Sequence, residues 1–436
     1  MMRYYTSFPV SILAALLLVG TGCTSKASNG PAGSVDTTFG GGDGIVITSV
    51  SSTTDDVFNG VTTDSNNRIV AVGRSAQATD DILVVRYLSD GTLDSSFDSD
   101  GIALIDVSGT ADEAFDVAID GNGKIVVVGK TNNGVNDDWL VMRLTSSGAL
   151  DATFSGDGIA MLDFAAGDDE AHAVAILASG NIAVVGVGKG STDDFAVAVY
   201  TSAGALDTSF DGDGIGTYDL ASGDQDRAFD VAASGTDLIL GGFARAGGGG
   251  DNFALLRIDS TGARVAGFGS NGQVLTDFNG DTDQGYAIAV TSTYVYLAGS
   301  INNGGNNLIG VTRHLLSNGS IDTAWDGDGK LEIDFGGVGS QRAEGIAVQG
   351  DGKVVVAGSA EITTGNDDVI IARTTTSGAL DTSFDGDGKR VTAPNGTEND
   401  RGHAVAAHLG TGFVVAGETH LTSPAQFDPL LIRYNQ

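Results

Sequence analysis

The chain has 436 residues, of which 56 are acidic and 22 are Lys or Arg, so its formal net charge at pH 7 is −34. Such a charge repels phosphate groups, which excludes nucleic acid and an anionic membrane face as binding partners. The 66 glycines and the many Asp residues are typical of turns and unfavourable within helices. We therefore expect an all-β protein.

The first 34 residues have the pattern of an exported protein. Arg3 precedes the apolar run 10–19, VSILAALLLV, which is too short to span a bilayer and is typical of a signal peptide. Cys23 is the only cysteine, which excludes a disulfide framework and a cysteine zinc site. We predict a signal peptide over residues 1–22 and a flexible, lipidated tether over residues 23–34.

The segment LLLVGTGC, residues 16–23, resembles a bacterial lipobox, with Gly20 where that pattern usually has Leu. The resemblance implies cleavage before Cys23 and a lipid on its sulfur. It also implies a lipoprotein of the bacterial cell envelope, at the outer membrane or cell surface, that touches the membrane only through its lipid. The alternative is an ordinary signal peptide followed by a chance cysteine.

A nine-residue motif recurs seven times from residue 35 onward. It reads LDTSFDGDG at residues 206–214, and near-copies begin at residues 35, 93, 150, 264, 321 and 380. The central aromatic residues lie 56 to 59 positions apart: Phe39, Phe97, Phe154, Phe210, Phe268, Trp325 and Phe384. A fixed period of this length predicts one array of repeats rather than two or three unrelated domains.

Each period contains four apolar runs of strand length and no helical pattern. In the second period these runs are 101–107 (GIALIDV), 114–119 (AFDVAI), 124–129 (KIVVVG) and 139–144 (WLVMRL). Short turns such as GNGK at 121–124 indicate antiparallel hairpins. Seven four-stranded meanders of about 57 residues predict a single seven-bladed β-propeller over residues 35–436.

The two ends of the repeat region complement each other. It begins with a motif and the run 45–50 (IVITSV), and it ends after a fourth run, 430–434 (LLIRY). We predict that these two runs pair, so that one N-terminal strand closes the ring by completing the last blade. The small-residue run, for example 228–233, should lie innermost because Gly and Ala fit easily near a crowded axis.

The combination of LDTSFDGDG, AFDVAI, GKIVVVG and DDxxxxR at this spacing resembles the delta-sixty repeat family of bacterial secreted β-propeller proteins, over residues 35–436. The resemblance implies the fold but no shared activity, cofactor or catalytic set. The sequence departs from the pattern at Val199, Val265, Asn271 and Phe427.

The motif itself predicts turn chemistry, in which the aromatic residue plugs the blade, Asp bonds backbone N–H groups and the last Gly takes a positive φ. Calcium at Asp207, Asp211 and Asp213 is the alternative, although the spacing lacks the bidentate Glu of an EF-hand. The fourth runs carry arginines that we expect to pair with Asp inside the blades: Arg86, Arg143, Arg257, Arg313, Arg373 and Arg433.

One face should carry the loops that vary in length and chemistry, which is where binding sites are usually built. A protein, a glycan or a small molecule is the expected ligand there. This face is also predicted to be strongly negative, either as a cation site or as a solvated acidic rim. Its acids are Asp55, Asp56, Asp112, Glu113, Asp168, Asp169, Glu170, Asp224, Asp226, Asp281 and Asp283.

Seven residues, one from the start of each inner strand, are predicted to ring the axial mouth: Asn59, Phe115, His172, Phe229, Tyr286, Glu344 and His403. Three of them, Glu344, His403 and Asn59, belong to consecutive blades and should converge opposite an aromatic side. Carboxylate and imidazole groups suit a divalent cation or a small ligand. The candidate ligand or metal residues are therefore Glu344, His403, Asn59 and His172, with an ordinary hydrated channel as the alternative.

Catalytic motifs such as G-x-S-x-G, H-E-x-x-H and a P-loop are missing from the sequence, and no catalytic residue is assigned. The sequence favours a surface-anchored, non-catalytic binding or adhesion propeller, expected to be a monomer. The alternative is a metal-dependent hydrolase or lactonase-like propeller with its site in the axial channel. No cofactor is expected, with calcium or another divalent cation as the exception.

Overall fold

The computed structural model describes residues 30–51, 54–77, 79–107, 109–164, 167–189, 193–221, 225–245, 249–278, 282–408, 410, 412–422 and 425–436. The predicted signal peptide and Cys23 lie outside the described residues. Within the described ranges, every regular element is a β-strand. No helix long and apolar enough to cross a membrane occurs among them.

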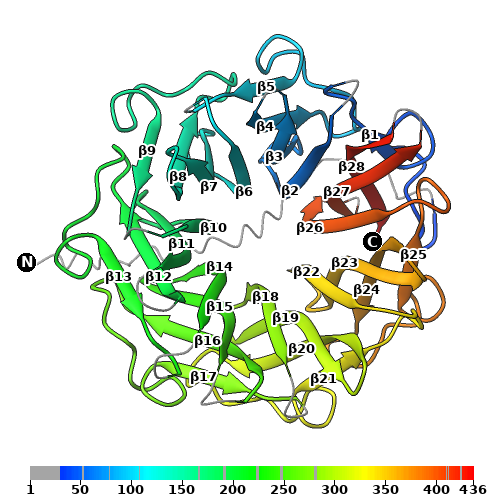
Figure 1. Ribbon diagram of the computed structural model, residues 1–436. Coiled ribbons are helices and arrows are strands. Elements are labelled where there is room, and N and C mark those ends of the chain that lie inside the picture. The colour runs from blue at the N-terminus through cyan, green and yellow to red at the C-terminus, as the bar shows by residue number, and fades with distance from the viewer. Residues whose placement is uncertain are drawn as a thin grey trace, which may run out of the picture.

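The strands form seven antiparallel sheets of four, arranged as blades around one axis (Figure 1). Blade one consists of β2 (Asp56–Thr63), β3 (Ile69–Ala76), β4 (Asp80–Tyr87) and β5 (Ile102–Ile105), and blade two of β6 (Asp112–Ile119), β7 (Ile125–Asn132), β8 (Asp137–Leu144) and β9 (Ile159–Leu162). Blade three consists of β10 (Glu170–Ile176), β11 (Ile182–Lys189), β12 (Asp193–Tyr200) and β13 (Ile215–Tyr218). Blade four consists of β14 (Asp226–Ser234), β15 (Asp237–Arg245), β16 (Asp251–Ile258) and β17 (Gln273–Thr276).

Blades five to seven are β18 (Asp283–Val290), β19 (Tyr294–Asn303), β20 (Asn306–Leu315) and β21 (Lys330–Ile333); β22 (Gln341–Val348), β23 (Val354–Thr363), β24 (Asn366–Thr374) and β25 (Lys389–Thr392); and β26 (Asp400–His408), β27 (Gly412–Thr422), β28 (Ala425–Asn435) and β1 (Ile45–Ile47). The first strand of each blade is the small-residue run and lies nearest the axis (Figure 1). The predicted seven-bladed propeller is therefore confirmed.

The ring closes as predicted. β1 pairs antiparallel with β28, with Ile45 opposite Ile432 and Ile47 opposite Leu430. Figure 1 shows the N-terminal strand, in blue, at the outer edge of the red C-terminal blade. The strand is shorter than the predicted run 45–50, because regular pairing with β28 ends at Ile47. The last blade is thus built from both ends of the chain.

The hydrophobic core lies between neighbouring blades rather than at the centre of the ring. The cluster between blades three and four, for example, joins Phe195 and Phe210 to Leu240 and Leu256. All seven motif aromatics are buried, each exposing at most 2% of its surface. The last motif glycine, Gly214 for example, has φ 93°, and a Cβ there would lie 2.8 Å from that of Leu206. The turn chemistry predicted for the motif is confirmed.

Five of the predicted arginines pair with the first Asp of a motif. The pairs are Arg86 with Asp94, Arg143 with Asp151, Arg313 with Asp322, Arg373 with Asp381 and Arg433 with Asp36. Each guanidinium also lies over the motif aromatic, as Arg143 does at 4.9 Å from the Phe154 ring centre. A stacked, charge-assisted pair anchors the motif to its blade.

The two departures from this pairing are compensated by other strands. Val265 replaces the motif acid of Arg257, and Asp237 at the start of β15 takes its place, 2.7 Å from the guanidinium. Val199 replaces the arginine opposite Asp207, and Asn181 donates to that carboxylate at 2.7 Å instead. The half-buried group that remains therefore keeps a hydrogen-bond partner when the motif position loses either residue.

The exposed acidic rim predicted from the sequence is wrong for the acids that open the inner strands. Six of these residues are fully buried: Asp56, Asp112, Asp169, Asp226, Asp283 and Asp400. Each turns into the seam between two blades and accepts a hydrogen bond from the chain that leaves the preceding outer strand, as Asp112 does from the Val107 N–H at 2.8 Å. Alternation along the strand hides these carboxylates because position one points away from the channel.

Candidate ligand site in the axial channel

A β-bulge in every inner strand creates the channel lining. In β22, Ala343 pairs with Gly358 and Gly345 with Ala357, which leaves Glu344 outside the ladder. The same one-residue skip occurs in the other six blades, and the seven skipped residues are Asn59, Phe115, His172, Phe229, Tyr286, Glu344 and His403. A bulge redirects a side chain out of the pairing pattern. The predicted ring is therefore present, one residue from each blade.

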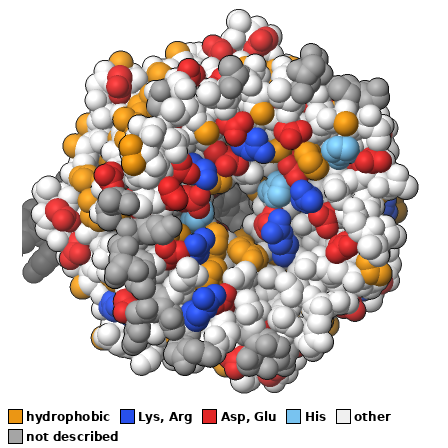
Figure 2. Space-filling model, in the orientation of Figure 1, with side chains coloured by type: hydrophobic (Ala, Val, Ile, Leu, Met, Phe, Trp, Pro, Cys, Tyr) orange, Lys and Arg blue, Asp and Glu red, His pale blue; other side chains and the backbone are white. Residues whose placement is uncertain are grey.

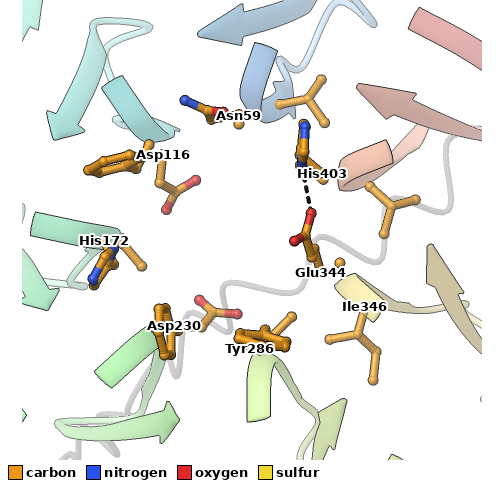
Figure 3. Close-up of a pocket in the computed structure, with 17 residues that line it drawn as sticks. Asn59, Asp116, His172, Asp230, Tyr286, Glu344, Ile346 and His403 are labelled. Carbon is orange, nitrogen blue, oxygen red and sulfur yellow. Dashed lines mark hydrogen bonds and ion pairs between the residues drawn. The ribbon is translucent and has the colours of Figure 1, made fainter. Parts of the chain in front are cut away.

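These seven side chains line a cavity of about 180 Å³ on the axis, together with Asp116 and Asp230. Figure 3 shows the labelled residues around the channel, with Asp116 and Asp230 pointing toward its centre. Figure 2 looks down the axis, and charged and histidine side chains gather around the central hollow on this face. The cavity is thus small and enclosed by the blades, with a charged mouth.

One side of the channel is a continuous aromatic wall. The ring centres of Phe115 and His172 are 5.5 Å apart, those of His172 and Phe229 are 4.8 Å apart, and those of Phe229 and Tyr286 are 5.3 Å apart. Burial lowers the pKa of His172 to about 4, so its imidazole is neutral at pH 7. His172, predicted as a polar ligand residue, therefore lies within the aromatic wall.

The opposite side is held by ion pairs. His403 Nδ1 lies 2.6 Å from Glu344 Oε2 (Figure 3), and Arg342 Nε lies 2.7 Å from Glu344 Oε1. Arg401 bonds Glu418 at 2.9 Å behind them. Burial alone would raise the pKa of Glu344 and lower that of His403, but the mutual attraction of the pair reverses both directions. The ion pair therefore favours the charged form of each group.

Asn59 does not join Glu344 and His403. Its side-chain amide donates to Glu113 Oε1 at 3.1 Å and to the Ala114 carbonyl at 2.9 Å, both in blade two. The amide therefore bridges blades one and two. Of the three polar residues expected to converge, the structure brings together only the carboxylate and the imidazole.

Two half-buried carboxylates in the channel were not predicted. Asp116 accepts hydrogen bonds from the N–H groups of Val117 at 2.7 Å and Val174 at 2.9 Å, and Asp230 makes the same pair of bonds two blades further on. Burial raises the pKa of Asp116 to about 6 and that of Asp230 to about 7, the latter with help from the charge on Asp116. The repeated AFDVA at residues 114–118 and 228–232 is the sequence signal for them.

The acids of the motif loop serve the turn. Asp207 Oδ1 accepts from the N–H and the hydroxyl of Ser209, at 3.0 and 2.7 Å, and Asp213 Oδ1 accepts from the Ile215 N–H at 3.0 Å. Asp211 adopts φ 46°, the left-handed conformation that Asp tolerates. Calcium at this loop would have to displace these local bonds.

Three segments of the chain, residues 65–97, 121–154 and 349–384, match the family described as "Domain of unknown function (DUF5122) beta-propeller". They span three of the seven repeats and support a propeller repeat family. A search of curated proteins found no match.

Several solved structures share the architecture. They include Sqt1 from Chaetomium thermophilum (16% identity, 84% of this chain and 82% of that chain covered, TM-score 0.45) and the periplasmic gluconolactonase PpgL from Pseudomonas aeruginosa (14%, 87% and 97%, 0.49). BamB from Moraxella catarrhalis is another (12%, 86% and 86%, 0.37). At these identities and TM-scores, they carry no argument about the function of this chain.

Proposed function

We propose that this chain is an exported, lipid-anchored, non-catalytic propeller that binds a small hydroxylated ligand, such as a single sugar residue, in the axial channel. The observation that supports it is the pairing of an aromatic wall with a charged wall in one cavity of about 180 Å³. Convergent polar groups beside an apolar surface are what small-ligand sites require. Aromatic faces pack against the C–H side of a sugar ring, while carboxylate and guanidinium groups bond its hydroxyls.

The charged wall favours binding over hydrolysis. Glu344 is already paired with Arg342 and His403, so a divalent cation at this carboxylate would have to displace a guanidinium and an imidazole group. The imidazole pairs with a carboxylate and not with a hydroxyl or thiol that it could activate. The metal-dependent alternative therefore has less support from the geometry than a binding site.

The binding proposal is tested with a panel of neutral and amino monosaccharides in ligand-observed saturation-transfer NMR. We expect transfer to at least one sugar, and at least tenfold weaker binding in Phe229→Ala and His403→Gln, which each remove one wall. His420→Gln is the matched control, because His420 pairs with Glu398 at 3.0 Å away from the channel. Absence of transfer for every sugar, or equal binding in all variants, would contradict the proposal.

The anchor is proposed from the lipobox-like segment that ends at Cys23. Two or more acyl chains are needed for stable anchoring, so we expect a diacylglyceryl group on the Cys23 sulfur and an acylated amino group. Mass spectrometry of the mature N-terminus from a bacterial host measures this directly. Cleavage at another residue, or an unmodified Cys23, would show that the chain is exported without an anchor.

A further inference from the structure

The seams between consecutive blades carry a repeated set of three side chains that the channel does not use. In the seam between blades three and four these are Asp194 near the start of β12, Asp219 after β13, and Asp226 at the start of β14. One carboxylate oxygen from each lies within 4.8 Å of the others. Two residues belong to blade three and one to blade four, so the cluster spans the seam.

Asp226 has one carboxylate oxygen, Oδ1, without a hydrogen-bond partner in the part of the chain that the structure describes. Its side chain is fully buried. Oδ2 accepts from the N–H groups of Leu220 at 2.6 Å and Ala221 at 3.1 Å, whereas Oδ1 accepts no hydrogen bond. The nearby N–H of Arg245 donates to the Gln225 carbonyl at 3.1 Å and also interacts with the Asp226 carboxylate. A buried carboxylate oxygen without a full hydrogen bond is costly, and a bound cation would offset that cost.

Other seams supply the missing donor from the protein itself. The strand-paired residue donates a hydroxyl to the equivalent oxygen in three blades: Ser75 to Asp56, Thr131 to Asp112, and Thr419 to Asp400. The residue paired with Asp226 is Ala244, which has no hydroxyl. The seam between blades three and four therefore lacks a donor that its counterparts have.

In two further seams, an amide side chain donates a hydrogen bond to one of the carboxylates. Between blades five and six, Gln341 replaces the buried acid, and its amide donates to Asp334 Oδ1 at 2.8 Å. Between blades two and three, where Asp138, Asp163 and Asp169 also cluster, Asn133 donates to Asp138 at 2.9 Å. In each of these seams an amide therefore donates to one of the clustered carboxylates.

We propose that Asp194, Asp219 and Asp226 bind a calcium ion that ties blade three to blade four. The ligands are carboxylate oxygens alone, which suit a hard divalent cation. The oxygens lie within 4.8 Å of one another, which fits an ion with bonds of about 2.4 Å, as in calcium sites. This site is separate from the motif loop and from the axial channel.

The test uses the full chain, depleted of metal with EGTA and titrated with CaCl₂ by isothermal calorimetry and thermal melting. We expect calcium binding with a Kd of about 1 mM or tighter, in the range of extracellular sites, and a rise in Tm. Asp226→Asn and Asp194→Asn should each bind one calcium ion fewer and lose most of the rise in Tm.

Asp283→Asn is the matched control. Asp283 is the equally buried counterpart of Asp226 in the next seam, where Asn252 stands in place of the β12 acid, so this variant should bind calcium as the wild type does. Far-UV circular dichroism measures whether each variant is folded. If Asp226→Asn does not fold, the Asp194→Asn variant still tests the proposal. Either of two results would overturn the proposal: no heat and no rise in Tm at about 10 mM calcium, well above the weakest extracellular sites, or an unchanged number of bound ions in both seam variants.

Discussion

A chain that lacks residues 35–50 is expected to lose at least about 6 kcal/mol of unfolding free energy and to aggregate. The deletion removes β1 and leaves β28 at an open sheet edge, which is a template for association. It also removes Phe39, which is fully buried, and Asp36, the buried partner of Arg433. Loss of a buried Phe costs about 3 to 5 kcal/mol, and a broken buried ion pair costs a similar amount.

Urea unfolding and size-exclusion chromatography measure the two effects of this deletion. The control is a chain that begins at Gly30, because it keeps every contact described above. If the deletion variant unfolds at the same urea concentration as this control and remains monodisperse, the N-terminal strand does not stabilise the ring.

The Arg433→Met variant is expected to be about 3 to 5 kcal/mol less stable than the wild type at neutral pH. Arg433 Nη2 lies 2.9 Å from Asp36 Oδ2, both side chains are at most 4% exposed, and the guanidinium lies 4.7 Å from the centre of the Phe39 ring. Methionine replaces the packing volume but leaves the Asp36 carboxylate charged and buried. Chemical unfolding at pH 7 measures the difference.

The pH dependence of this difference has a defined sign. Burial alone would raise the pKa of Asp36, but the Thr38 hydrogen bonds and the Arg433 charge together hold it below its usual value. The stabilisation is therefore complete above the ordinary aspartate pKa of about 3.9 and is lost as the pH falls through the lower pKa of the folded state. Wild type and Arg433→Met should thus converge in stability once the pH falls below the lowered pKa of Asp36.

The double variant Asp36→Val, Arg433→Met is the control for a buried unpaired charge. It should recover at least half of the stability lost in the single variant, because an apolar pair removes the orphaned carboxylate. The chain already carries Val199 and Val265 at the two equivalent positions of other blades. A single variant within about 1 kcal/mol of the wild type would mean that the pair is solvated and unimportant.

The fold could be predicted because the spacing of motifs along the sequence is enough to indicate it. The motif at 206–214 fixes the period, and the complementary runs 45–50 and 430–434 indicate that the ring closes. Residues such as Glu344 and His403 could be placed on the axis for the same reason, since each occupies a fixed position within its repeat. Position within a repeat is what a periodic sequence encodes most directly.

Partnerships between strands were harder to predict. Arg257 pairs with the carboxylate of Asp237, and Asp207 accepts a hydrogen bond from the amide of Asn181, although neither partner is part of the motif. Asn59 lies in the ring as predicted but bonds Ala114 of the adjacent blade on its other side. Such choices depend on distances between side chains in neighbouring sheets, which the spacing of residues along the chain does not record.

The buried acids were missed for a related reason. Runs such as Asp112 with Glu113 suggest a solvated turn, yet the first carboxylate enters the seam while the second remains partly exposed. In the channel, Asp116 occupies a position where most blades have Gly or Ala. Its burial becomes evident only when the bulge at Phe115 and the N–H groups of the next blade are seen together.

The bulge at each ring position separates the residues that line the channel from the residues that hold the sheets together. Because Glu344 and its six counterparts stand outside the pairing ladder, exchange of their side chains leaves the register of every sheet unchanged. The chemistry of the axial channel therefore depends on seven residues, one per repeat, that can vary independently of the residues that specify the propeller fold. A few point mutations at these seven positions could therefore change the ligand of the channel while the structure of the blades stays the same.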